Sequence, residues 1–284
     1  MLYKEYALNL CGISFAERSR GFESIKKYAV NMQGERRVYI GSEFCSFFMR
    51  VFHMKLYDFI NELLKLVNKI TIVFPNVIEG DFPIVENIVA GMKEFEDVDE
   101  FVVNDFGTLH YLAKNDCKKK IVLGRLFSKN LRDPRIDLKN YKNINDKTII
   151  TNLVYNTPFY LELREKMQIK RMESDYISDY FIDNLFEELM VSIHYPYTYV
   201  TSGIVCVIGS MHKDQSDKFK LKNKCNFECT KYYNRVEHET FFNPVVHIGN
   251  AFFYKVHDNK LEYNENSNVR LVYNPFYSQE VNPK

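Results

Sequence analysis

The sequence has no apolar run long enough to cross a membrane. A helix that spans a bilayer needs about 20 consecutive apolar residues, and every apolar stretch in this chain is interrupted before that length. The opening, MLYKEYALNLCGISFAERSRG, lacks the basic start, apolar middle and small-residue cleavage site of a secretory signal. We therefore expect a cytoplasmic protein with no membrane span. Thiols remain reduced there, so its six cysteines are expected to be ligands, catalysts or core residues rather than disulfides.

The chain also lacks an excess of charge of either sign, with 38 Lys and Arg against 37 Asp and Glu. Proteins that bind duplex nucleic acid usually carry a basic excess, so duplex DNA is not an expected partner. The net charge does not exclude a local basic groove, because it does not report how charges are distributed. The length of 284 residues suits one large α/β domain or two smaller ones.

Several motifs that define large enzyme classes are missing. There is no H-E-x-x-H, because His238 and Glu239 have no second histidine at the required spacing. There is no G-x-S-x-G, no G-x-x-x-x-G-K-[ST], no EF-hand loop, and no G-x-G-x-x-G after the first strand. The missing motifs do not exclude a nucleophilic cysteine paired with a distant histidine, because those residues need not be neighbours in sequence.

What is present is a repeated alternation of strand and helix patterns. The clearest helix covers residues 55–67, where the apolar residues fall on one stripe, and a β-branched strand follows at residues 70–77. Further helices are predicted at 84–95, 108–115 and 159–168, and further strands at 99–105, 118–126, 152–158, 169–177 and 188–200. Such alternation with short connections is typical of a parallel sheet. We predict an α/β fold, specifically a TIM-barrel-like (β/α) barrel with some helices irregular or missing.

The pattern changes after about residue 200. Residues 214–235 are polar, contain two cysteines and show little helical periodicity, whereas residues 245–276 alternate like a small β-meander. We predict a barrel-like domain over residues 1–200 and a cysteine-bearing β elaboration over residues 201–284. The two parts are expected to pack together as one structural unit.

Four cysteines are the candidate ligands of a metal centre. Cys225 and Cys229 form a C-x-x-x-C pair in a polar segment, and on a helical turn both would face one way. Cys206 lies in the apolar stretch GIVCVIG, expected to be a strand, and Cys45 follows another predicted strand. Because the carboxyl ends of barrel strands meet on one face, the four thiols can converge. Four thiolates suit tetrahedral zinc or an iron–sulfur cluster; the alternative is that Cys45 and Cys206 are core thiols.

Four stretches and three later cysteines together resemble one known family. VYIGSEFCSF (residues 38–47), VNDFGTLHYL (103–112), VLGRLFSKNLRDPRI (122–136) and FYLELREKMQIKRMESD (159–175) resemble, in order, segments of the peptidase U-thirty-two family. Cys206, Cys225 and Cys229 follow in the order of the C…C-x-x-x-C ligands of its UbiU/UbiV-type members, with the UbiV-like subgroup the nearer fit. The resemblance covers roughly residues 30–235.

The resemblance implies a barrel-like fold holding one oxygen-sensitive 4Fe–4S cluster through Cys45, Cys206, Cys225 and Cys229, with zinc as the alternative filling. It implies oxygen-independent hydroxylation of a quinone precursor or of an RNA base, with a homologous UbiU-like subunit as a possible heterodimer partner. A second interpretation is a cluster- or zinc-stabilised module that binds a partner or RNA without catalysis. Peptidase activity is not expected, because no convincing protease nucleophile or hydrolase metal motif is present. Cys11 and Cys117 are expected not to be ligands.

Three further residues are weak catalytic candidates. Arg125 follows a strand and could bind an anionic substrate, although it could equally belong to a structural salt bridge. Asp105 could line the barrel mouth, but a helix cap is the favoured interpretation. His194 could move protons, yet a histidine in a strand is more often a structural hydrogen-bonding residue.

Overall fold

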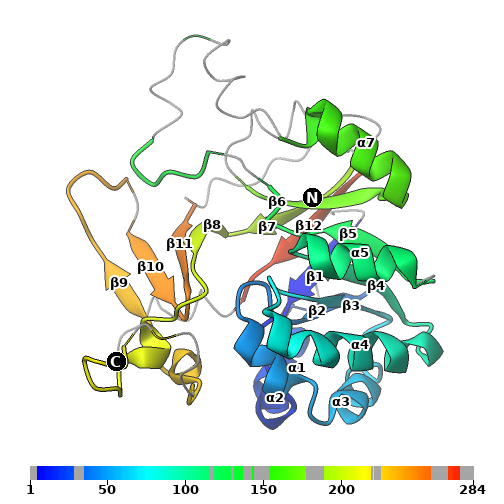
Figure 1. Cartoon of the computed structure of the whole chain (residues 1–284), viewed down its shortest axis with the longest axis horizontal. Coiled ribbons are helices and arrows are strands. Elements are labelled where there is room, and N and C mark those ends of the chain that lie inside the picture. The colour runs from blue at the N-terminus through cyan, green and yellow to red at the C-terminus, as the bar shows by residue number, and fades with distance from the viewer. Residues whose placement is uncertain are drawn as a thin grey trace.

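Eight parallel strands close into a barrel in the computed structural model of the chain (Figure 1). The structure describes residues 5–28, 35–115, 118–128, 131–136, 143, 154–176, 189–218, 220, 225–242, 244–256 and 268–275. The predicted TIM-barrel-like α/β fold is confirmed. Around the barrel the strands follow the order β1 (Glu5–Asn9), β12 (Val269–Tyr273), β7 (Met190–Tyr195), β6 (Arg171–Asp175), β5 (Lys120–Leu123), β4 (Val98–Val103), β3 (Lys69–Val73) and β2 (Arg37–Gly41).

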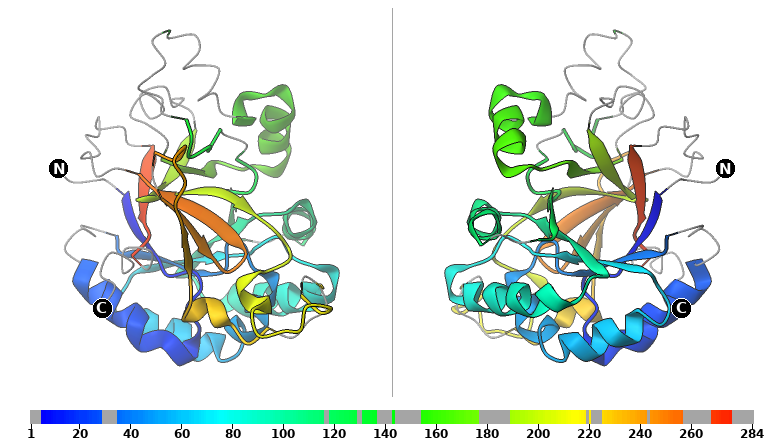
Figure 2. Two further views of the ribbon diagram at one scale, coloured as in Figure 1. Left: turned by 90° about the vertical axis from the view of Figure 1, so that its left-hand side faces the viewer. Right: turned by 90° about the vertical axis from the view of Figure 1, so that its right-hand side faces the viewer.

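Helices cover the outside of the barrel along one part of its circumference (Figures 1 and 2). They are α1 (Arg18–Tyr28), α2 (Met49–Phe52), α3 (Leu56–Leu63), α4 (Phe82–Gly91), α5 (Phe106–Lys114) and α7 (Pro158–Met167). The apolar stripe expected over residues 55–67 is the buried face of α3, where Phe59, Ile60 and Leu63 are fully buried against the strands. No helix in the described part of the chain is long and apolar enough to cross a bilayer.

A four-stranded antiparallel sheet is formed by strands that lie between β7 and β12 in the chain. Its strands are β8 (Tyr197–Ser202), β11 (Ala251–Lys255), β10 (Val245–Ile248) and β9 (Asn234–Val236), in that spatial order. In Figure 1 the orange strands of this sheet lie on the side of the barrel away from α4 and α5. The predicted meander over residues 245–276 is therefore only half right: β10 and β11 form a hairpin, but β12 returns to the barrel.

The return of β12 changes the expected domain boundary. β12 pairs in parallel with β1 on one side and with β7 on the other, so Val269–Tyr273 closes the barrel. A division at residue 200 does not separate barrel from elaboration, because the small sheet is an insertion between two barrel strands. The single predicted strand over 188–200 is likewise two strands in different sheets, which meet at the cis peptide bond Tyr195–Pro196.

Two other predicted strands are absent from their expected places. GIVCVIG forms a loop that ends in a short 3₁₀ helix, Ile208–Ser210, rather than a strand. In the stretch 152–158, the residues Val154–Asn156 also form a 3₁₀ turn, and residues 152 and 153 lie outside the described part of the chain. Apolar runs of this length do not distinguish a strand from a buried loop by periodicity alone.

The interior of the barrel has an apolar layer between two charged ones. Six strands contribute to the apolar layer, through Ala7, Tyr39, Val73, Val102, Val122 and Val272. Near the strand starts, Arg270 donates two hydrogen bonds to Glu100 at 2.6 and 2.9 Å, and Arg37 lies 3.3 Å from the same carboxylate. Near the strand ends a second charged layer surrounds Arg125. Buried ions need such pairing, because an isolated charge in this medium is costly.

The charged layer near the strand starts predicts acid sensitivity. Burial by itself raises the pKa of Glu100, but the guanidinium groups of Arg270 and Arg37 override it and lower the pKa to about 2. A carboxyl whose pKa is lower in the folded state stabilises the protein above its ordinary pKa and loses that effect as pH falls toward the folded value. We expect the free energy of unfolding to fall by about 3 kcal/mol between pH 4.5 and pH 2 from this group.

Urea unfolding curves measured across this pH range test the prediction. In Glu100→Gln the pH dependence should be smaller, and stability at neutral pH should be lower because two arginines lose their counter-ion. An unchanged pH profile in this variant would contradict the assignment.

Candidate functional site

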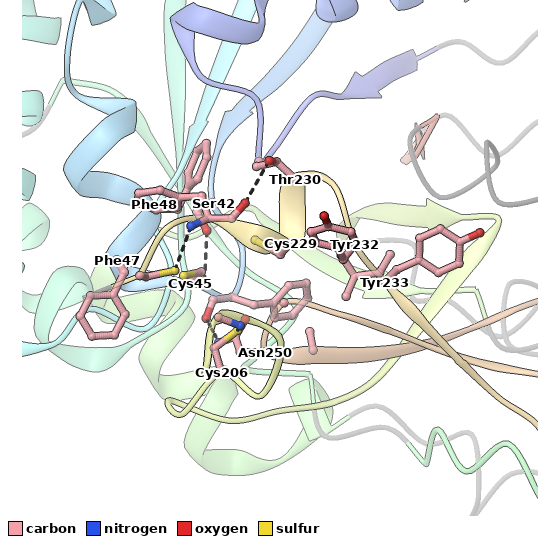
Figure 3. Close-up of a pocket in the computed structure, with 18 of the residues that line it drawn as sticks. Ser42, Cys45, Phe47, Phe48, Cys206, Cys229, Thr230, Tyr232, Tyr233 and Asn250 are labelled. Carbon is pink, nitrogen blue, oxygen red and sulfur yellow. Dashed lines mark hydrogen bonds between the residues drawn. The ribbon is translucent and has the colours of Figure 1, made fainter. Parts of the chain in front are cut away.

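A cavity of about 420 Å³ lies between the carboxyl ends of the barrel strands and the loops of the small sheet. The carboxyl-terminal face is where (β/α) barrels carry their active sites. All four candidate ligands, Cys45, Cys206, Cys225 and Cys229, line this cavity. Figure 3 shows Cys45, Cys206 and Cys229 around it, from the barrel side and from the loop side. Cysteines separated by more than 150 residues in sequence therefore share one space.

Cys45 is positioned by the turn that follows β2. Gly41 ends the strand at φ +116°, a conformation that favours glycine, and a Cβ at this position would collide with the carbonyl oxygen of Val73. The chain then bends, and the backbone N–H of Cys45 donates to Ser42 Oγ at 3.1 Å (Figure 3). Cys45 is followed directly by the 3₁₀ turn Ser46–Phe48, so its thiol lies at the barrel rim, as predicted for a residue at a strand end.

Cys206 lies in the loop between β8 and the turn Ile208–Ser210. The backbone N–H of Gly209 donates to the sulfur of Cys206 at 3.1 Å, and Ser210 Oγ donates to the carbonyl oxygen of Cys206 at 2.7 Å. A Cβ on Gly209 would lie 3.1 Å from the Cys225 sulfur and 3.4 Å from the Cys206 sulfur. The absence of a side chain at position 209 keeps open the space between these two thiols.

The C-x-x-x-C pair is not on a single helical turn. Cys225 precedes Phe227, whose φ of +58° is left-handed, and only Cys229 lies in the 3₁₀ turn Glu228–Thr230. The backbone N–H of Phe227 donates to the sulfur of Cys225 at 3.3 Å. Both cysteines still line one cavity, so the expected convergence holds although its expected helical cause does not.

A polar contact joins the two loops that carry these cysteines. Nδ1 of His212, just after the Cys206 loop, contacts Oε1 of Glu228, the neighbour of Cys229. Its Nε2 lies 3.3 Å from the side-chain amide of Asn226. His212 therefore fixes the Cys206 loop against the segment that contains Cys225 and Cys229.

The four thiols are close enough to influence one another without forming a tight group. Burial raises the pKa of Cys45 and of Cys229 to about 12, and neighbouring cysteines add to the shift for both. Burial also raises the pKa of Cys206 and of Cys225. Among the described residues, no three cysteine sulfurs lie within 4.8 Å of one another. Four thiolates could coexist here only with a positive centre between them.

The remaining two cysteines are Cys11 and Cys117. Cys11 lines the same cavity beyond the end of β1, and burial raises its pKa well above the usual range, with the Glu43 carboxylate adding to the effect. Cys117 lies outside the described residues. Cys11 is thus closer to the candidate centre than the sequence indicated.

Arg125 is the centre of a buried ionic network beneath the cavity. Its Nε and Nη2 donate to Glu43 at 3.0 and 2.6 Å, and its Nη1 donates to Asp175 at 2.7 Å. Arg132 donates to the other oxygen of Asp175 at 2.6 Å. The guanidinium of Arg125 is 1% exposed and bound on two sides, which favours the structural interpretation over direct substrate binding.

His194 joins the same network from β7. Its Nε2 lies 3.0 Å from Glu173 Oε2, and its Nδ1 lies 3.6 Å from Glu43 Oε1. Glu43, Glu173 and His194 are all buried, and their ligand atoms lie within 4.8 Å of one another. Of these, Glu43 alone also lines the cavity, so it connects the buried network to the open space.

Asp105 lies at the start of α5 and caps it. Its carboxylate accepts from the backbone N–H of Thr108 at 2.8 Å and from Val77 N–H at 3.3 Å. Its neighbour Asn104 donates to the carbonyl oxygen of Phe74 and accepts from the N–H of Leu126. Neither residue is among those that line the cavity, so the helix cap accounts for Asp105.

Cationic and aromatic side chains complete the cavity wall. The cationic residues are Arg20, Lys213, Lys220 and Lys231, and the aromatic ones are Phe44, Phe47, Phe48, Phe227, Tyr232, Tyr233 and Phe253. Glu43 is the one carboxylate among the lining residues described. Such a wall favours an anionic, flat ligand, because cations and ring faces both contribute to its binding.

The fold and the site together define a parallel (β/α) barrel with a four-cysteine cavity at the carboxyl ends of its strands. Comparisons of the chain with protein-family models, with curated proteins and with solved structures find no match.

Sequence reasoning missed the carboxylates of the site. Glu173 and Asp175 lie in β6, where all five residues are buried, and Glu43 follows β2. A signal was present: charged residues at alternate positions of a short strand in a parallel sheet must point into the barrel or into its wall, and both places require partners.

Proposed function

We propose that the chain binds one 4Fe–4S cluster through Cys45, Cys206, Cys225 and Cys229 and acts in oxygen-independent hydroxylation, alone or as a subunit. The observation that carries the proposal is the convergence of these four cysteines on one cavity at the carboxyl-terminal face of the barrel. The resemblance to the peptidase U-thirty-two family, in its UbiV-like form, supports the same ligand set.

The residues around the thiols fit a cluster. Four cysteines are the usual ligands of a 4Fe–4S centre, and N–H groups that donate to the sulfurs tune its potential. Gly209 and Phe227 supply such N–H groups to Cys206 and Cys225. Gly209 also leaves a space that a Cβ would fill. The rings of Phe47 and Phe48 lie beside Cys45 and would limit the access of water and oxygen (Figure 3).

The spacing of the thiols favours a cluster over zinc. Sulfurs bound to one tetrahedral zinc ion, each about 2.3 Å from the metal, lie only about 3.8 Å apart. A cluster places iron and sulfide between the cysteines and so separates their sulfurs more widely. In the described chain no three of these sulfurs approach within 4.8 Å, which suits the larger centre.

The cluster and the side chains of the cavity would have different roles in the reaction. The bound cluster would supply electron or oxygen-atom transfer. The chain itself binds and orients the substrate: Lys213, Lys231 and Arg20 provide positive charge at the cavity wall, and Tyr232 and Tyr233 provide ring faces. An anionic aromatic molecule fits these features, a class that contains both quinone precursors and RNA nucleotides.

Metal and sulfide analysis of anaerobically purified protein tests the proposal. We expect a brown protein with about four iron and four sulfide per chain, because a cubane cluster contains that number. The absorption should fade on exposure to air. A colourless protein that contains zinc would contradict the proposal, and an iron–sulfur protein without any hydroxylation activity alongside a homologous partner would indicate a binding module.

A further inference from the structure

The barrel contains a second group of potential ligands, below the cysteines. Glu43, Glu173 and His194 come from three different strands or strand ends, and their ligand atoms lie within 4.8 Å of one another. Glu173 and His194 are 1% and 0% exposed, so this group is shielded from bulk water. The cluster proposed above uses none of these residues.

Two polar atoms of this group have no hydrogen-bond partner within the described part of the chain. They are His194 Nδ1 and Glu173 Oε1, both buried. Buried polar atoms almost always have a partner, so each orphan requires an explanation. His194 Nε2 lies 3.0 Å from Glu173 Oε2, and in the neutral tautomer that donates this hydrogen bond Nδ1 carries a lone pair that faces the lone pairs of Glu43 Oε1. Two acceptors facing each other need a positive group between them.

The charges of the buried network also require a positive group at this place. Three carboxylates belong to the network, Glu43, Glu173 and Asp175, against the two guanidinium groups of Arg125 and Arg132. With a neutral imidazole at His194, one negative charge is uncompensated in a buried place, and a proton or a metal ion there would neutralise it.

The distance distinguishes a metal ion from a proton. His194 Nδ1 and Glu43 Oε1 are 3.6 Å apart, longer than a hydrogen bond, so a proton placed on Nδ1 would have no good acceptor. Nitrogen and oxygen ligands about 2.1 Å from one tetrahedral metal ion lie about 3.4 Å apart. The contacts of His194 with Glu173 and of Glu43 with Arg125 are of the kind that orient metal ligands.

We infer that His194 Nδ1 and Glu43 Oε1 form a second metal site, distinct from the four cysteines, for a divalent first-row transition ion, with Glu173 orienting the imidazole through Nε2. One imidazole and one carboxylate form a mixed nitrogen and oxygen donor set, which suits Mn²⁺, Fe²⁺ or Zn²⁺. Because Glu43 also lines the cavity, an ion at this site would be reached from the same space as the substrate.

Equilibrium dialysis of the EDTA-treated protein against Mn²⁺ tests the site. Mn²⁺ is the chosen probe because it prefers oxygen and nitrogen to thiolate ligands, so the cysteines do not compete. We expect one Mn²⁺ per chain, an affinity at least about 100-fold weaker in His194→Gln and about 10- to 100-fold weaker in Glu173→Gln, and no change in the matched control Glu162→Gln on the surface of α7. Binding should also survive in Cys45→Ser, which separates this site from the cluster.

A second measurement needs only the wild-type chain. Crystals soaked in Mn²⁺ should show an anomalous peak between Glu43 and His194. Failure of the wild-type protein to bind Mn²⁺ would overturn the inference, as would equal binding by folded Glu173→Gln or an anomalous peak located elsewhere. None of these outcomes depends on whether the cysteines hold a cluster, which iron and sulfide content reports separately.

Discussion

Replacing Cys45 with serine should abolish cluster binding and any hydroxylation while the barrel stays folded. Cys45 lies in the short turn after β2, and its thiol borders the cavity, so the change removes one of four ligands and leaves the strand pairing of β2 unaltered. Serine binds iron poorly compared with a thiolate, which is the ligand that iron–sulfur clusters use. We expect the iron and sulfide content of the anaerobic protein to fall from about four of each to near zero.

The matched control is Cys11→Ser, because Cys11 lines the same cavity but is not assigned as a ligand. This variant should retain its iron, sulfide and visible absorption. Circular dichroism should show a native fold for both variants. If Cys45→Ser kept its full iron content, or if Cys11→Ser lost it, the assignment of ligands would be wrong.

Replacing Arg125 with methionine should destabilise the protein by about 3–5 kcal/mol, the effect of leaving a buried charge without its partner. Arg125 donates three hydrogen bonds to carboxylates on two sides, two to Glu43 and one to Asp175, and it is almost completely buried. Methionine fills part of the volume but pairs with neither carboxylate. The measurement is the midpoint of urea unfolding at neutral pH, compared with that of the wild type.

Arg135→Met serves as the control for this prediction. Arg135 forms an ion pair with Asp133 on an exposed turn, and such pairs contribute little to stability. Its unfolding midpoint should remain close to that of the wild type. Equal midpoints for Arg125→Met and the wild type would show that the buried network does not stabilise the barrel.

The sequence predicted those features that depend on neighbouring residues. The stripe of α3 follows from the spacing of Phe59, Ile60 and Leu63, and the cap of α5 follows from Asp105 three residues before Thr108. Such patterns are local, because a helix brings together residues three or four positions apart. The same reasoning failed for GIVCVIG, where an apolar run forms a loop that packs beside the cavity.

By itself, the sequence determined that this protein is an α/β chain with alternating units and that Cys225 and Cys229 lie near each other, since these depend on periodicity and short spacing. The tertiary structure alone decided that β12 closes the barrel, that Arg125 joins Glu43 to Asp175, and that His194 faces Glu43. These contacts join residues far apart in the chain. Their energies depend on burial and charge pairing around a closed barrel, which no local pattern encodes.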